Sequence, residues 1–115
     1  MNTEKLLNLI KTSLEDKKAQ NINILNVRNL SSITDFMVVA TGNTARQVKA
    51  SAEYVMEQTK GHGHCSLGNE GTNVGEWALV DLGDVIVHVM QPQIRDFYQL
   101  EKLWTNLGND VQLSQ

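Results

Sequence analysis

The chain has 115 residues, 41% of them hydrophobic and 5% aromatic, which is an ordinary composition for one globular domain. No apolar run approaches the roughly 18 residues of a membrane span, and the first residues lack the features of a signal peptide, so we expect a soluble cytoplasmic protein. A single cysteine, Cys65, excludes an internal disulfide and a multi-cysteine zinc site. The net charge of −3 argues against a large basic surface for nucleic acid.

The charges are unevenly distributed along the chain. Residues 1–60 carry eight bases and six acids, whereas residues 61–115 carry two bases and seven acids. No Lys or Arg occurs from Gly61 to Ile94, where four acids fall: Glu70, Glu76, Asp81 and Asp84. An acidic surface of this kind attracts a basic partner and repels RNA.

The first third of the chain predicts a helix followed by two strands. Leu6, Ile10 and Leu14 recur at helical spacing within an amphipathic segment from about Thr3 to Gln20. Residues 22–27 predict a short strand with an irregularity near Asn26. The continuous apolar run of residues 36–40 is typical of a strand that is buried on both faces.

A second helix and a loop follow. Gly42, Asn43 and Thr44 interrupt the strand and supply candidates for a helix cap, and apolar residues then recur at helical spacing as far as Gly61. Residues 61–76 are rich in glycine and predict a loop, with residues 65–67 as a possible short edge strand.

The clearest local pattern is a hairpin, formed by residues 77–82 and 85–90 around a type II′ turn at Gly83-Asp84. Pairing Leu82 with Val85 places six apolar residues on one face, which we expect to be core: Ala78, Val80, Leu82, Val85, Val87 and Val89. The other face is mixed and suits a contact surface; it carries Trp77, Leu79, Asp81, Ile86, His88 and Met90.

Pro92 marks the start of a last helical region, which extends to Gly108 as one bent helix or two short ones. Together these elements predict a single α+β domain over residues 1–115, with a mixed sheet of four or five strands and the first two helices packed against it.

Three groups of residues invite a chemical interpretation, and each has a simpler one. The turn at residues 41–44 can bind an anion at the helix start, but it lacks a P-loop pattern and is more often a cap. His62, His64 and Cys65 lack a fourth ligand and favour a flexible loop over a metal site. The carboxylates of Asp35, Asp81 and Asp84 have no nucleophile or base beside them in any recognisable pattern, so we expect no enzyme, no metal and no cofactor.

The chain resembles the ribosomal silencing factor family, also called the Iojap family, from about residue 4 to residue 104. The segments that carry the resemblance are Asp16-Lys17-Lys18-Ala19, Ser31 to Phe36, Thr41 to Val48, Glu70-Gly71, Trp77 to Met90 and Arg95 to Trp104. One departure is Gln47, where the family often has His, and the tail from Thr105 to Gln115 extends past the motif.

The resemblance implies a nucleotidyltransferase-like fold without established enzymatic activity. It implies a translational repressor that binds ribosomal protein L-fourteen on the large ribosomal subunit and blocks joining of the small subunit when nutrients are limiting. Family motifs place the contact surface at Trp77, Asp81, His88 and Tyr98, and we extend it to Glu70, Leu79, Asp84 and Arg95.

Two other functions stay open at this point: an enzyme with a nucleotidyltransferase-like fold, and a homo-oligomeric adaptor whose mixed face buries against its own copy. A homodimer away from the ribosome is compatible with ribosome binding, because one exposed face can serve both in turn. The mildly basic N-terminal half is then free to lie near rRNA, and no membrane partner is expected.

Overall fold

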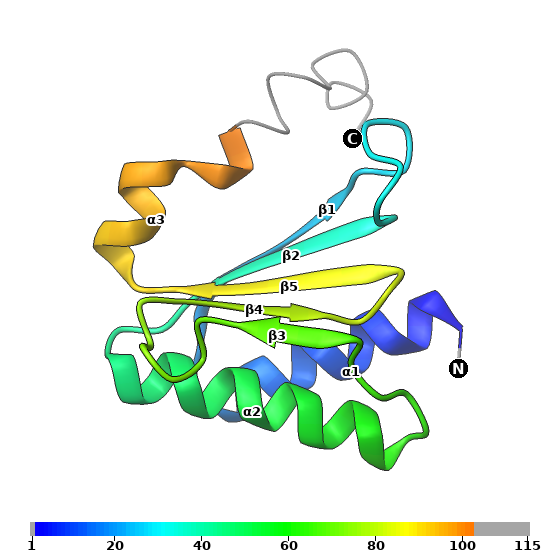
Figure 1. The fold of residues 1–115 in the computed structure, drawn as a ribbon, viewed down its shortest axis with the longest axis horizontal. Helices are drawn as coiled ribbons and strands as arrows, with labels where there is room; N and C mark the ends of the chain where they lie inside the picture. Colours follow the sequence, from blue (N-terminus) through cyan, green and yellow to red (C-terminus); the bar gives the residue numbers. More distant parts are fainter. Residues whose placement is uncertain (1, 103–115) are drawn as a thin grey trace.

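Three helices and five strands make up the described part of the computed structural model, which covers residues 2–102 (Figure 1). They are α1 (Thr3–Asp16), β1 (Gln20–Asn26), β2 (Phe36–Thr41), α2 (Ala45–Gly61), β3 (Gly68–Glu70), β4 (Trp77–Asp81), β5 (Val85–Met90) and α3 (Pro92–Tyr98). The strands form one sheet in the order β1-β2-β5-β4-β3. The β2–β5 pair is parallel and the other pairs are antiparallel, so the predicted mixed α+β sheet is confirmed with five strands.

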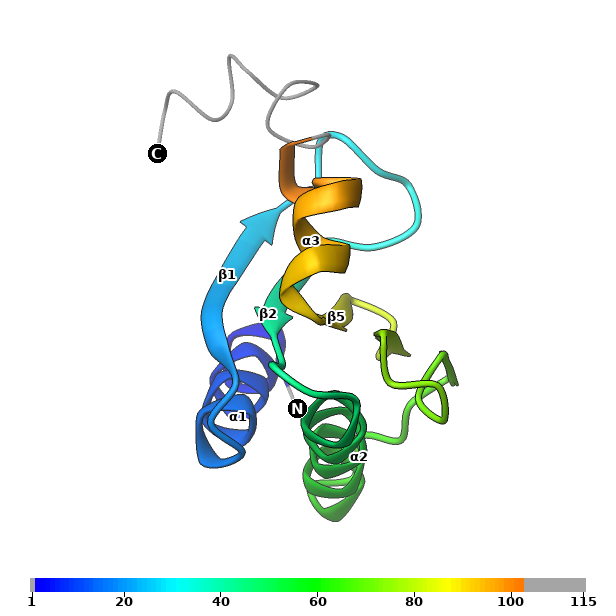
Figure 2. The same ribbon diagram turned by 90° about the vertical axis from the view of Figure 1, so that its left-hand side faces the viewer.

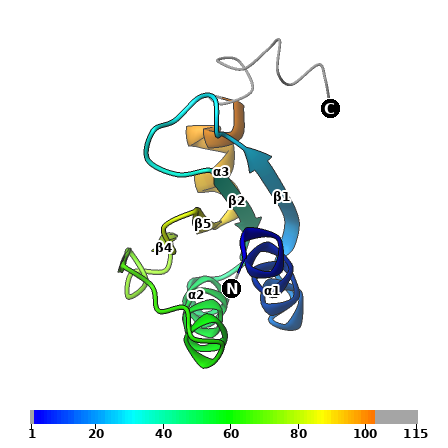
Figure 3. The same cartoon turned by 90° about the vertical axis from the view of Figure 1, so that its right-hand side faces the viewer.

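One face of the sheet, here called the core face, is covered by α1 and α2, while α3 lies on the opposite side, called the outer face (Figures 2 and 3). The main hydrophobic cluster lies under α1 and α2 and includes Leu6, Ile10 and Leu14 of α1. All six hairpin residues predicted to be core belong to this cluster and are at most 1% exposed. Burial of these apolar side chains is the main source of the domain's stability.

Helix α1 ends at Asp16, four residues earlier than its periodicity predicts. Lys18 has a left-handed backbone with φ of 63°, its N–H donates to Glu15, and the N–H of Ala19 donates to Leu14. This is the Schellman arrangement, which normally uses glycine at the left-handed position. Because a lysine stands there instead, the sequence carries no recognisable stop signal.

Two further boundaries differ from the sequence prediction. The irregularity of β1 lies between Gln20 and Asn23, where Asn21 has φ of 51°, and not near Asn26. The edge strand is residues 68–70 rather than 65–67, because these residues pair with β4 from Asp81 to Leu79. Backbone pairing with a neighbouring strand defines β3, whose own side chains are all exposed.

The start of α2 is fixed by side-chain caps. The Thr44 hydroxyl accepts from the Gln47 N–H, and the Gln47 side-chain oxygen accepts from the Asn43 N–H. The Gln47 amide also donates to the carbonyls of Lys17 and Lys18, which ties α2 to the turn after α1. Gln47 therefore has a structural role at the position where it departs from the family pattern. The backbone N–H groups of Asn43 and Gln47, which belong to the possible anion site, already donate to side-chain oxygens.

Helix α3 begins at Pro92 as predicted and stops after two turns, because Gln99 adopts a left-handed backbone with φ of 48°. Residues 100–102 are helical again, which favours two short helices over one bent helix. The predicted continuation through Leu103, Trp104 and Leu107 lies outside the described residues. Within residues 2–102, no helix is long and apolar enough to cross a membrane.

Candidate functional site: an aromatic cluster on the outer face

The hairpin register places the mixed set of side chains on the outer face. Trp77 lies opposite Met90, Leu79 opposite His88, and Asp81 opposite Ile86, as the sequence predicts. The turn has its positive φ at Gly83, 85°, which is required at the first position of a type II′ turn. The outer face is not uniformly open, however, because Met90 belongs to a second, smaller core with Val27, Met37 and Val39, and His88 is also buried.

His88 is a buried partner of Trp77. The indole Nε1 of Trp77 donates to Nδ1 of His88 over 2.9 Å, and the histidine is only 5% exposed. Because indole can only donate, Nδ1 must be unprotonated in this arrangement. Burial lowers the pKa of His88 to about 4, so the imidazole is neutral at physiological pH. His88 therefore holds the Trp77 ring in place from the neighbouring strand.

Trp77, Tyr98 and Phe97 form an aromatic cluster on the surface. The rings of Trp77 and Tyr98 are tilted with centroids 5.0 Å apart, and Phe97 meets Tyr98 edge-on at 5.0 Å. Tyr98 is 54% and Phe97 is 79% exposed. Large aromatic side chains so exposed are uncommon away from binding surfaces, and aromatic residues dominate the energetics of many interfaces.

Phe97 is absent from the predicted contact residues. Its helical spacing from Ile94 and Leu100 gave no indication of a surface position, but the Phe97 side chain is 79% exposed. Phe97 and Tyr98 are consecutive in the sequence, and adjacent residues on a helix point in directions about 100° apart, so a helix that packs along a narrow face leaves one of them exposed.

The acidic residues lie on the strands beside this cluster. Exposed Glu70 on β3 is paired with Leu79, and half-buried Asp81 accepts from the Gly83 N–H at 2.9 Å. Asp84 is exposed in the hairpin turn, at the opposite end of β4 from Trp77, and accepts from the Thr3 hydroxyl. Leu79, Glu70 and Asp81 thus come together on the outer face, whereas Asp84 lies in the turn and its carboxylate contacts α1, which covers the core face (Figure 2).

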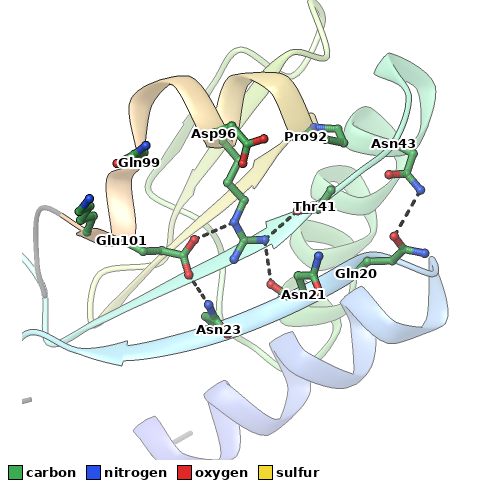
Figure 4. A pocket seen from close by; sticks show the side chains of 11 residues that line it. Gln20, Asn21, Asn23, Thr41, Asn43, Pro92, Asp96, Gln99 and Glu101 are labelled. Carbon is green, nitrogen blue, oxygen red and sulfur yellow. Dashed lines mark hydrogen bonds and ion pairs between the residues drawn. The ribbon is translucent and has the colours of Figure 1, made fainter.

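Arg95 lines a polar groove of about 800 Å³ between α3 and β1, and Figure 4 shows other residues of the groove, among them Asn21, Thr41 and Glu101. The groove is lined largely by amide and hydroxyl side chains, including Gln20, Asn43 and Thr41. The Arg95 side chain is 12% exposed, and its guanidinium donates to Asn21, Thr41 and Glu101. The structure therefore does not bring Arg95 together with the other predicted contact residues.

The histidines after α2 are engaged with the backbone. His62 Nδ1 lies 2.9 Å from the Gln58 carbonyl oxygen, and His64 Nε2 lies 2.8 Å from that of Leu82. Among the residues that the structure describes, no group of three or more His, Cys, Asp or Glu side chains is placed to hold a metal ion.

The fold and the outer face define a small α+β protein whose most prominent surface feature is an exposed aromatic cluster beside acidic residues. The family model described as "Ribosomal silencing factor during starvation" matches residues 1–115. The chain belongs to this ribosomal silencing factor family, and membership supports a ribosome-associated role in silencing translation. The family is named for silencing and not for an enzymatic activity.

Relatives confirm the assignment along most of the chain. The ribosomal silencing factor of Chromobacterium violaceum is 45% identical over 104 residues, which are 90% of this chain and 85% of that protein. That of Haemophilus influenzae is 43% identical over 99 residues, covering 86% of this chain and 97% of the relative. A crystal structure of a C. violaceum protein superposes with a TM-score of 0.89 at 45% identity, covering 90% of this chain and 87% of that one.

Proposed function

We propose that this protein represses translation by binding the large ribosomal subunit through ribosomal protein L-fourteen and preventing the small subunit from joining. The repression operates in the cytoplasm when nutrients are limiting. The family assignment supports a ribosomal partner, and the chemistry of the outer face supports a basic protein as the surface that is bound.

The observation that carries this proposal is the aromatic cluster. Trp77 is held by its hydrogen bond to His88 and by the ring contact with Tyr98. Its side chain therefore loses little conformational freedom when a partner covers it. Tyr98 and Phe97 supply exposed aromatic area next to it. A rigid aromatic anchor surrounded by polar residues is the arrangement found at binding hot spots.

Charge makes the proposed partner more specific. Glu70, Asp81 and Asp84 lie on the edge strand and on the hairpin that also carries Trp77, and the stretch from Gly61 to Ile94 contains no Lys or Arg. Such a surface is complementary to Lys and Arg side chains of a basic ribosomal protein and unsuited to RNA phosphates.

The mechanism requires no chemical step. A standard protein interface of about 1,600 Å² is enough for a stable complex. A protein of 115 residues that occupies an intersubunit contact excludes the small subunit by its volume alone.

Co-sedimentation with separated ribosomal subunits tests the proposal. We expect the protein to sediment with the large subunit, and we expect addition of L-fourteen in excess to compete. Trp77→Ala should weaken binding about thirtyfold, which corresponds to about 2 kcal/mol, and Tyr98→Ala should weaken it less. In the same assay, excess protein should lower the yield of joined subunits.

The control is Ile33→Ala, which removes an exposed apolar side chain from the loop before β2. Circular dichroism establishes that each variant is folded. Large-subunit affinity that is unchanged in both folded Trp77→Ala and folded Tyr98→Ala would refute the proposed contact surface.

A further inference from the structure

Helix α3 carries two of the three residues of the aromatic cluster, and among its own residues only Ile94 packs as a partly buried apolar side chain against the smaller core. None of its seven residues is buried, and no side chain caps its N-terminus. A helix this short is not stable by itself in water. Its position over the sheet, and therefore the position of Tyr98 beside Trp77, must depend on contacts made by particular side chains.

Arg95 makes the strongest of these contacts. Its Nη1 donates to the Asn21 carbonyl at 2.8 Å and to the Thr41 hydroxyl at 2.7 Å, which joins α3 to β1 and β2 (Figure 4). Its Nε donates to Glu101 at 2.7 Å, just beyond the break at Gln99. One guanidinium thus connects four segments of the chain, which a planar group with five donors is well suited to do.

The irregularity of β1 contributes directly to this network. Asn21 lies where the β1–β2 register shifts and has a left-handed backbone, and it is the carbonyl of this residue that accepts from Arg95. An extra residue in a strand commonly redirects backbone groups in this way.

Glu101 completes the network from the other side of Arg95. Partial burial alone would raise the pKa of Glu101, but hydrogen bonds from Arg95 and Asn23 and the charge of Arg95 outweigh it and lower the pKa. Asn23 is on β1, so the carboxylate also connects the segment after α3 to the sheet. An ion pair with both partners largely shielded from water is stronger than an exposed one.

We propose that Arg95 is a positioning residue for the ribosome-binding face: its guanidinium fixes α3 on β1 and β2 and thereby holds Tyr98 against Trp77. This role differs from the direct partner contact to which we extended the prediction for Arg95 from the sequence. The proposed role of Arg95 deepens the proposed function. The second test below rests on that function, whereas the first test uses the free protein alone.

The first test follows the fluorescence of Trp77 in a Trp104→Phe background, since the chain has two tryptophans. Arg95→Met keeps the length of the side chain but removes every donor. We expect its Trp77 emission to shift to longer wavelength, as in Tyr98→Ala, because release of α3 exposes the indole. Arg95→Lys keeps the charge without the fork of donors, and we expect an intermediate shift.

Lys102→Met is the matched control, because it removes the same charge from a neighbouring exposed residue outside the network. Thr41→Val is a milder variant that removes one acceptor of Arg95 and keeps the side-chain volume. We expect a small shift in Thr41→Val and none in Lys102→Met. If circular dichroism shows that Arg95→Met is unfolded, the emission shifts of Thr41→Val and Arg95→Lys test the proposal instead. Unchanged emission in every folded variant of the network would overturn the proposal.

The second test is a double-mutant cycle on large-subunit affinity with Arg95→Met and Tyr98→Ala. A positioning residue acts through Tyr98, so each single variant should weaken binding about tenfold and the double variant should be no weaker than Tyr98→Ala alone. Multiplied losses would show that Arg95 contacts the partner itself and would overturn the proposal. If no variant changes affinity, the proposed contact surface fails, while the emission shift still decides the role of Arg95.

Discussion

The two faces of the sheet are covered in very different ways. On the core face, α1, α2 and the sheet bury a continuous cluster of fifteen apolar residues among those described. On the outer face, the corresponding cluster has four buried residues, and α3 covers it without burying any residue of its own. Because apolar burial dominates stability, the core face maintains the fold and leaves the outer face free to present aromatic and acidic side chains.

This contrast also separates two kinds of contact. The core face is closed mainly by dispersion and the hydrophobic effect, which are not directional. The outer face is arranged by directional bonds, of which Trp77 to His88 and Arg95 to its three acceptors are the main ones. Mutations on the core face should therefore affect mainly stability, whereas mutations of the exposed aromatic and acidic side chains on the outer face should affect mainly binding.

The largest effect on stability is expected on the core face. Ile10→Ala removes a fully buried side chain of α1 and should lower the free energy of unfolding by about 4 kcal/mol. Urea unfolding measures this loss, and the remaining folded protein should bind large subunits with parental affinity. A comparable loss in Ile33→Ala, whose side chain is exposed, would contradict the division between the two faces.

Acid should weaken the outer face through His88. The folded pKa of about 4 lies below the ordinary value of 6.5, so between these values the unfolded chain binds a proton that the folded protein does not. His88 therefore stabilises the fold fully above pH 6.5, and about 3 kcal/mol of this is lost as the pH falls to 4.

His88→Asn isolates this contribution from that of the carboxylates, because the asparagine oxygen can still accept from Trp77 but does not titrate. Unfolding free energies measured between pH 4 and pH 7 should fall less steeply in this variant. Parallel profiles for the parent and His88→Asn would exclude a buried, neutral histidine.

Loss of a single hydrogen bond on the outer face should have a smaller effect. Trp77→Phe keeps an aromatic ring but leaves His88 Nδ1 without its donor, which should cost about 2 kcal/mol in urea unfolding. Tyr98→Phe is the control and should change stability by less than about 0.5 kcal/mol, since the side chain is exposed. Equal losses of unfolding free energy in Trp77→Phe and Tyr98→Phe would show that the hydrogen bond from Trp77 to His88 does not stabilise the fold.

The smallest effect is expected from the acidic residues. Asp81→Asn combined with Asp84→Asn should slow association with the large subunit about threefold at low salt, and the difference should disappear at high salt. Stopped-flow measurements over a salt series test this. The matched control, Glu53→Gln with Glu57→Gln, removes two exposed charges from α2 on the core side, and an equal slowing there would show that only net charge matters.

Prediction from the sequence succeeded where a local pattern and its physical cause coincide. The hairpin register was predictable because Gly83 permits the turn and because small and branched apolar residues alternate strictly along both strands with a mixed set of side chains, so that each set lies on one face. It failed where an ordinary residue adopts an unusual conformation, since Lys18 ends α1 in a backbone geometry that favours glycine and Asn21 forms the irregularity of β1. The short strand β3 has no apolar pattern because it is defined by its partner β4. The nucleotidyltransferase likeness stays a prediction, since the structural relatives are crystal structures from the same family.

The sequence by itself determined the family, the mixed sheet and the face of each hairpin strand that forms the core, because side-chain alternation depends only on neighbours along the chain. It also placed Trp77 and Asp81 together on the outer face. Only the tertiary structure decided what covers that face. His88 is buried, Phe97 is exposed and Arg95 is directed to β1 because a short helix from the end of the chain meets strands from its beginning, and no local pattern encodes such contacts.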